Sequence, residues 1–387
     1  MADDVIAGAI KLLLGDDSEQ SSMVDPEDEL VSTGTMTDFP SRCFLAYGEP
    51  VLRFDQVNAP SEGKVGGDVF RRTVYSKELQ LAQAVAALGN HSEFFTVLPP
   101  SPQGELVKAV CLESGTILRA AFAEEGNHIG DMTITRSGNW ETVHQRRYSA
   151  FHNKINHFRW DKGILSDRSP CWVHTSLSSF LWTENGLRNW SHLFDAAADP
   201  KRNPHDVLMS MELGSVESDA PFADLWTFVF PFLKKMYLLV ITPEECLQIA
   251  AIMGLDVERM HTRIHGDPHL QPWIPIVDTL RRKTSTKCIV VYFTQQSEDS
   301  VRFIVSHETG LTLLTPSVFT TVYAHLAKLV HAFMHVGALE DKERFQSLIN
   351  DLTWSRSIQN SRIASPNSPK DFPRRSIIKQ VIEEMSE

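Results

Sequence analysis

The 387-residue sequence lacks several features that would place it in common functional classes. It has no excess of basic residues: 37 lysines and arginines stand against 49 aspartates and glutamates, giving a formal charge of −12. Because net negative charge repels phosphate backbones, we expect no nucleic-acid partner. No run of about 18 apolar residues occurs, so the sequence predicts no transmembrane helix and no membrane partner.

Cysteine is also scarce. The five cysteines are odd in number, lie far apart and never form a C-x-x-C pair; they are Cys43, Cys111, Cys171, Cys246 and Cys288. This pattern predicts reduced, mostly buried thiols, with neither a disulfide framework nor a zinc or other metal site. Asp3 and Asp4 stand where a secretory signal would be basic, so we expect a cytoplasmic protein.

The chain divides into a body and two terminal segments of different composition. Residues 1–38 are predicted as a flexible extension, with a short docking helix as the alternative. Residues 39–339 carry the folded pattern. Residues 340–387 are predicted as a helix followed by a tail rich in serine and proline, which is typical of a linker.

Within the body, apolar runs typical of strands alternate with segments of helical periodicity. Strands are expected at 44–54, 94–99, 170–181, 206–213, 237–242, 287–295 and 301–307, and helices at 79–89, 102–115, 222–236, 243–254 and 318–337. This alternation predicts an α/β fold with a mostly parallel sheet, helices on both faces and ligands beyond the carboxyl ends of the strands. Period-two patterns predict small lid strands near 49–76 and 131–148.

Several fragments, in their order and spacing, resemble the pfkB (ribokinase-like) carbohydrate kinases, and among them 2-keto-3-deoxygluconate kinases. The fragments are GEPVLRF at 48–54, the paired Gly66 and Gly67 before a helix ending in AALG, RRYSAF at 146–151, and YLLVIT followed by two glutamates. The resemblance covers about residues 42–338. It implies a three-layer αβα domain with a β lid, a sugar site under the lid, and an ATP site in the C-terminal half.

In this family a G-A-G-D motif at the start of a long helix supplies the catalytic base and an anion hole of backbone N–H groups. The corresponding slot here reads Val322-Tyr323-Ala324-His325, so no glycine remains and His325 takes the place of the catalytic aspartate. The Cβ atoms of Val322 and Tyr323 would crowd a γ-phosphate. No other phosphate-binding glycine motif occurs in the chain.

The resemblance also assigns the other site positions, most of them altered. Substrate contacts would fall on Gly66, Gly67, Arg71, Arg147 and Glu212, and nucleotide contacts on Glu245, Thr294, Val322, Tyr323 and Ala324. Three assignments have open alternatives. Arg71 and Arg147 would bind an anionic sugar acid, or be exposed lid residues or ion-pair partners of nearby acids. Glu245 would hold Mg²⁺ through water or be a helix N-terminal acid. His261, His265 and His269 would bind zinc or be solvated loop residues.

Losses on the catalytic, sugar and nucleotide elements together predict a degenerate pseudokinase. It would act by binding, as an assembly subunit or a sugar-ligand sensor, with no cofactor. The expected partners are another protein or a second copy through the lid, and a small sugar or sugar acid. The alternative is a divergent active kinase that uses ATP and Mg²⁺ to phosphorylate a sugar or sugar acid.

Overall fold

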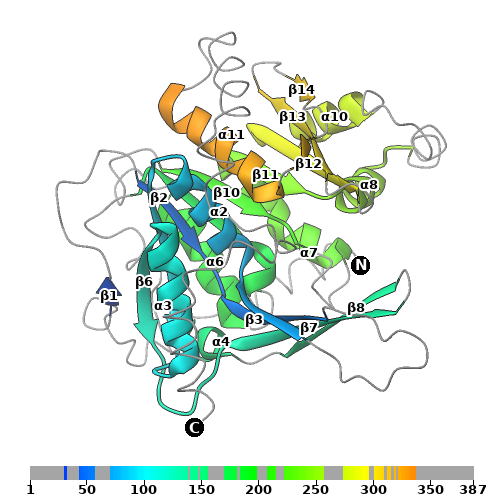
Figure 1. The fold of residues 1–387 in the computed structure, drawn as a ribbon. Helices are drawn as coiled ribbons and strands as arrows, with labels where there is room; N and C mark the ends of the chain where they lie inside the picture. Colours follow the sequence, from blue (N-terminus) through cyan, green and yellow to red (C-terminus); the bar gives the residue numbers. More distant parts are fainter. Residues whose placement is uncertain are drawn as a thin grey trace.

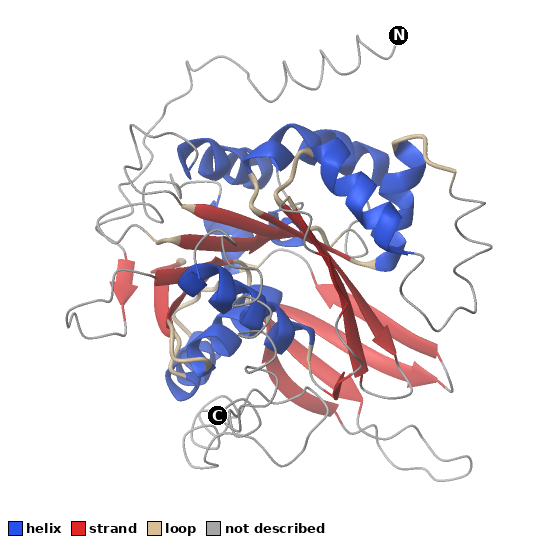
Figure 2. Ribbon diagram, turned by 90° about the horizontal axis from the view of Figure 1, so that it is seen from above, coloured by secondary structure: helices blue, strands red, loops and turns tan. Residues whose placement is uncertain are grey.

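The computed structural model of this chain describes fourteen segments, and helices lie on both faces of its large sheet (Figures 1 and 2). The described residues are 30–32, 43–56, 70–137, 140–146, 149–155, 170–180, 184–197, 207–214, 222–256, 273–295, 300–308, 312–314, 318–319 and 321–336.

The central sheet has eleven strands in the order β1-β6-β5-β2-β9-β10-β11-β12-β13-β14, and β15 pairs with β13. Their bounds are β1 Leu30–Ser32, β2 Cys43–Tyr47, β5 His91–Leu98, β6 Ile117–Phe122, β9 Trp172–Ser176, β10 Leu208–Glu212, β11 Leu238–Ile241, β12 Cys288–Gln295, β13 Ser300–His307, β14 Thr312–Leu314 and β15 Val318–Phe319. The strands from β6 to β12 are all parallel, and antiparallel strands flank them at both edges. The predicted mostly parallel sheet is therefore confirmed.

Two helical layers cover the sheet, one on each face (Figure 2). One layer contains α2 Lys77–Ala87, α3 Pro102–Ser114 and α11 Val322–Val336, and the other contains α4 Ala150–Ile155, α6 Glu184–Ala197, α7 Phe222–Val229, α8 Pro243–Ile252 and α10 Ile274–Thr284. Strand residues alternate between the layers: Leu45 and Tyr47 pack on the α6 side, whereas Phe44 and Ala46 pack on the α2 side. Burial on both faces explains why the strands are continuously apolar.

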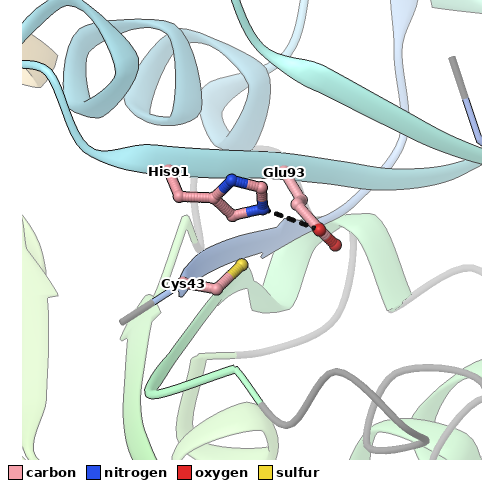
Figure 3. Close-up of side chains that lie close together, drawn as sticks. All are labelled: Cys43, His91 and Glu93. Atoms are coloured by element: carbon pink, nitrogen blue, oxygen red, sulfur yellow. Dashed lines mark hydrogen bonds and ion pairs between the residues drawn. The ribbon is translucent and has the colours of Figure 1, made fainter. Parts of the chain in front are cut away.

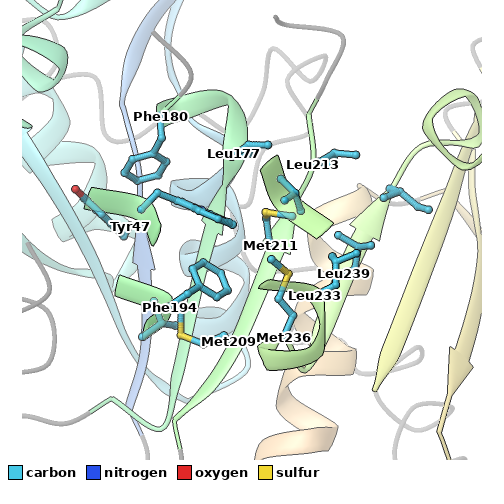
Figure 4. Close-up of a cluster of buried hydrophobic side chains, with 14 of the residues drawn as sticks. Tyr47, Leu177, Phe180, Phe194, Met209, Met211, Leu213, Leu233, Met236 and Leu239 are labelled. Atoms are coloured by element: carbon cyan, nitrogen blue, oxygen red, sulfur yellow. The ribbon is translucent and has the colours of Figure 1, made fainter. Parts of the chain in front are cut away.

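The core on the α6 side combines aromatic and methionine side chains (Figure 4). Trp190 and Phe194 of α6 have ring centroids 4.4 Å apart, and Tyr47 lies 4.8 Å from Phe180 in an edge-on contact. Phe180 ends a 3₁₀ helix, η2 (Leu177–Phe180), that follows β9 directly. The aromatic contacts therefore fix the chain where it leaves the carboxyl end of β9.

A separate four-stranded sheet, the lid sheet, has the order β4-β3-β7-β8. Its strands are β3 Val51–Gln56, β4 Phe70–Tyr75, β7 Gly130–Ser137 and β8 Trp140–Arg146, and in Figure 1 it extends away from the central sheet. Val51, Met132 and Ile134 form its own small buried cluster, with Tyr75 packed against them. The predicted β lid is confirmed.

The expected single strand at 44–54 is wrong, because the chain turns after Tyr47 and its two halves join different sheets. A second error concerns residues 318–337: Val318 and Phe319 form β15, and the helix begins only at Val322. The helix expected over 222–236 is interrupted at its proline, since α7 gives way to a 3₁₀ helix, η4 (Phe230–Lys235), that contains Pro231.

The terminal segments are described only in part. Within residues 1–38, Leu30–Ser32 form β1 and pair antiparallel with β6. Residues 340–387 and the three histidines at 261, 265 and 269 lie outside the described residues. Among the helices that are described, none has the length and apolar character needed to cross a membrane.

Candidate functional site

A small cavity of about 30 Å³ lies where the lid sheet meets the carboxyl ends of β2 and β9. We call it the junction pocket. A cavity of this volume has room for a water molecule. Its lining comprises Glu49, Val51, Tyr75, Ser76, Lys77, Glu78, Met132, Ser176, Ser178 and Ser179.

Glu78, in the first turn of α2, is the acidic group at the base of this pocket, and its side chain is fully buried. Its Oε1 accepts hydrogen bonds from the Ser176 backbone N–H (3.0 Å), the Ser176 hydroxyl and the Ser179 hydroxyl (2.8 Å). Its Oε2 accepts from the Ser76 hydroxyl at 2.7 Å. Burial raises the pKa of Glu78, and the hydrogen bonds from Ser176 and Ser76 oppose that shift.

Gly48 is required beside this carboxylate. A Cβ atom at position 48 would lie 2.2 Å from Cδ of Glu78, well inside van der Waals contact. The neighbouring Glu49 is also buried, and its Oε2 lies 3.2 Å from Nε2 of His152 in α4. Burial lowers the pKa of His152 to about 4, so the imidazole is neutral near pH 7.

A third buried carboxylate, Glu212, ends β10 and is 1% exposed. Its Oε1 lies 3.2 Å from Nζ of Lys77 and accepts a hydrogen bond from the Tyr292 hydroxyl at 3.1 Å. Its Oε2 accepts from the Tyr323 hydroxyl at 3.2 Å. The predicted substrate residue Glu212 therefore sits in an internal network with one ammonium group and two phenol groups.

The start of α11 is the position that the family resemblance assigns to the anion hole, where the sequence predicts that the hole has been lost. Tyr323 spans from this helix to Glu212 at the end of β10, so its ring and hydroxyl occupy the space between the two elements. The Ala324 backbone N–H is one of the donors that have no acceptor within the helix at its start. It donates to the Thr321 hydroxyl at 3.2 Å. Val322 packs partly buried against the core on the α2 side.

His325, in the slot of the catalytic aspartate, turns into the protein interior. It is 4% exposed, and its ring lies 4.9 Å from that of Phe303 in an edge-on contact. Burial, with a smaller contribution from Lys328, lowers the pKa of His325 to about 3. The Nε2 atom is buried without a hydrogen-bond partner in the described part of the chain. His325 is absent from the lining of the junction pocket.

The other predicted nucleotide residues are Glu245 and Thr294. Glu245 forms a capping box at the start of α8: its Oε2 accepts from the Thr242 backbone N–H at 2.9 Å, and the Thr242 hydroxyl accepts from its own N–H. This geometry matches the helix N-terminal acid that the sequence left as an alternative. Thr294 lies exposed near the end of β12, opposite Val301.

Among the predicted substrate residues, Gly66, Gly67 and Arg147 lie outside the described residues. Arg71 lies on β4 directly opposite Asp55, which pairs with Arg53 at 2.8 Å. Arg71 shares the lid face of Val51, Tyr75 and Met132 but does not line the junction pocket. The structure thus brings Glu212 and Tyr323 together.

Sequence reasoning missed Lys77, Glu78, Ser176 and Tyr292. Ser76, which caps α2 by accepting from the Leu79 N–H at 3.3 Å, followed by an acid in the first turn is a recognisable helix start. That signal locates the helix. It does not show that Glu78 turns inward toward strands about 100 residues away.

A parallel sheet between two helical layers, a β lid at its carboxyl edge and a long helix starting there define the ribokinase-like class of α/β folds. Solved structures agree. The 2-dehydro-3-deoxygluconokinase of Thermotoga maritima matches with a TM-score of 0.64 at 17% identity, covering 91% of this chain and 100% of that one. A PfkB family carbohydrate kinase from Listeria grayi matches with a TM-score of 0.60 at 12% identity, covering 81% and 100%.

The fructokinase of Xylella fastidiosa, solved with bound ATP, matches with a TM-score of 0.55 at 15% identity, covering 90% of this chain and 100% of that one. No family model matches the chain, and no curated protein matches it in sequence. At these identities the likeness establishes the fold. The chain therefore has the fold of the pfkB carbohydrate kinases, as the sequence fragments indicated.

Proposed function

We propose that this protein is a carbohydrate-kinase-fold protein that does not transfer phosphate and acts by binding another protein, as a subunit of an assembly. The observation that carries the proposal is the start of α11. There the Tyr323 hydroxyl donates to Glu212 and the Ala324 N–H donates to the Thr321 hydroxyl. His325 is buried against Phe303. An anion hole requires open N–H groups at a helix start, and these residues do not fit a nucleotide phosphate.

The proton chemistry of the slot supports the same proposal. A general base must lie within hydrogen-bond reach of the substrate hydroxyl and have a pKa near the working pH. His325 has a pKa of about 3 and packs on an aromatic ring away from the junction pocket. Nothing in its position lets it replace the aspartate of the family motif.

The region that the family resemblance assigns to the sugar favours a protein partner over a small ligand. The junction pocket of about 30 Å³ has room for about two water molecules. Its Glu78 carboxylate already accepts from three serines, and Glu212 is held by a lysine and two tyrosines. These acids stabilise the domain from within, so a sugar-ligand sensor is the less supported form of the proposal.

The lid sheet is the surface that we propose for the contact, with a second copy of this chain as the simplest partner. Its edge strand β4 pairs on one side only within the described residues, and Phe70 on that strand is 39% exposed. Edge strands offer unpaired backbone groups to a neighbouring chain. Light scattering should give a dimer mass that Phe70→Asp lowers to a monomer. Leu112→Asp, at an exposed position of helix α3, is the control and should leave the mass unchanged.

The proposal that the protein does not transfer phosphate is tested with ATP–Mg²⁺. A ligand at about 100 times its Kd would stabilise the fold by about 2.7 kcal/mol, a readily measured rise in Tm. We expect no rise with ATP–Mg²⁺ and no ADP formation with 2-keto-3-deoxygluconate or fructose. A turnover that His325→Ala abolishes would instead establish the alternative, a divergent active kinase using ATP and Mg²⁺.

A further inference from the structure

The opposite edge of the central sheet carries a second cluster of reactive side chains, far from the junction pocket. Cys43 is the first residue of β2 and His91 the first of β5, and the two stand in register on adjacent parallel strands. Glu93 follows two residues along β5, so all three side chains lie on the same face of the sheet. Figure 3 shows the Cys43 sulfur facing His91 and Glu93 from the neighbouring strand.

The distances between these groups are close to those of a metal centre. Nε2 of His91 lies 3.0 Å from Oε1 of Glu93, and one ligand atom from each of the three residues lies within 4.8 Å of the others. Tetrahedral zinc with bonds of about 2.0–2.3 Å places its ligand atoms roughly 3.3–3.6 Å apart. Side-chain shifts of about an ångström would therefore complete the coordination.

The surroundings suit a bound cation. Cys43 and Glu93 are buried, and His91 is partly buried. Arg119 of β6 holds the second oxygen of Glu93, Oε2, with its Nη1 at 3.3 Å, which leaves Oε1 directed at His91. Outer partners that orient a ligand in this way are typical of metal sites. The nearby Cys171 thiol donates to the Cys43 carbonyl at 3.2 Å and is not one of the three candidate ligands.

We propose that Cys43, His91 and Glu93 form a binding site for one zinc ion at the amino-terminal edge of the central sheet. Thiolate, imidazole and carboxylate together suit zinc, and three protein ligands leave one position for water. The ion would link β2 to β5 at their starts. The sequence expectation of no metal site rested on spacing along the chain, whereas this cluster is assembled across two strands.

The test uses the full-length protein, stripped with a chelator and titrated first with Co²⁺ and then with Zn²⁺. We expect a thiolate-to-cobalt charge-transfer band that saturates at one equivalent and disappears when zinc displaces cobalt. Cys43→Ser should lose the band and weaken zinc binding by more than about 100-fold, beyond the 10–100-fold of an outer-partner change. Cys111→Ser, a buried thiol on α3, should change neither.

Absence of the band in the wild-type protein at excess Co²⁺ overturns the proposal. This measurement does not require any variant to fold. A band that persists in folded Cys43→Ser, or that Cys111→Ser removes equally, also overturns it. Glu93→Gln, which keeps the shape of the side chain, should weaken zinc binding at least about 10-fold. If Glu93→Gln binds zinc as tightly as the wild type does, Glu93 is not a ligand and the proposed site is wrong.

Discussion

Replacing Tyr323 with phenylalanine tests whether its hydroxyl closes the slot that the family resemblance assigns to a phosphate. The substitution keeps the ring against the core and removes the hydrogen bond to Oε2 of Glu212, which is 3.2 Å long. Hydrogen bonds to charged groups contribute about 1.5–3 kcal/mol when buried. Because Glu212 keeps its contacts with Lys77 and Tyr292, we expect a loss near the lower end, about 1.5 kcal/mol.

Urea unfolding followed by tryptophan fluorescence measures this loss as a fall in midpoint at constant m-value. Tyr237→Phe is the matched comparison, because its hydroxyl lies 3.3 Å from Nε2 of His307, an imidazole whose pKa burial lowers to about 4. Its acceptor is neutral near pH 7, so the loss should be smaller, about 1 kcal/mol.

A double-mutant cycle of Tyr323→Phe with Glu212→Gln should give a coupling of about 0.5–3 kcal/mol. If Tyr323→Phe stays within about 0.5 kcal/mol of the wild type, as exposed positions do, the hydroxyl does not make this bond and the argument for a closed slot fails.

Three further substitutions follow from the same geometry. Gly48→Ala should destabilise the fold by about 1–3 kcal/mol, since its Cβ would overlap Glu78, and Glu78→Ala in the same chain should remove most of this penalty. Thr321→Ala should cost about 1 kcal/mol through loss of the cap on the Ala324 N–H, measured by urea unfolding. His325 has a folded pKa of about 3 and an unfolded pKa near 6.5, so the unfolded chain binds its proton first and stability falls as the pH drops below about 6.5. Between pH 7 and pH 5 this group accounts for about 2 kcal/mol, at 1.36 kcal/mol per unit, and His325→Phe should make the stability profile shallower by that amount.

Each of these has an outcome that contradicts it. Strictly additive losses in the Gly48→Ala, Glu78→Ala pair would mean that the two side chains do not meet. A Thr321→Ala variant as stable as the wild type would place no cap at the start of α11. Identical pH profiles for the wild type and His325→Phe would mean that His325 is solvated, which would return it to consideration as a proton acceptor.

Local patterns in the sequence were sufficient to predict the secondary structure where a pattern has one physical solution. Helix α3 begins with Pro102 at its first turn and ends at Gly115, whose φ of 72° favours glycine. The apolar runs of β11 and β12 are buried on both faces, so they could only be central strands. By contrast, the turn after Tyr47 was missed although Gly48 and Pro50 are local turn signals, and only the structure shows that the Glu78 carboxylate lies where a side chain at position 48 would be.

By itself the sequence determined the fold class, the position of the lid strands and the absence of glycine from residues 322–325, since each is written in residue type and spacing along the chain. Only the tertiary structure decided which contacts the candidate site residues make. It brought Tyr323 to Glu212 across 111 positions and Glu78 to Ser176 across 98, and it placed Cys43 beside His91 on adjacent strands. Such contacts depend on strand order and register, and these follow from how the whole sheet packs between its helical layers.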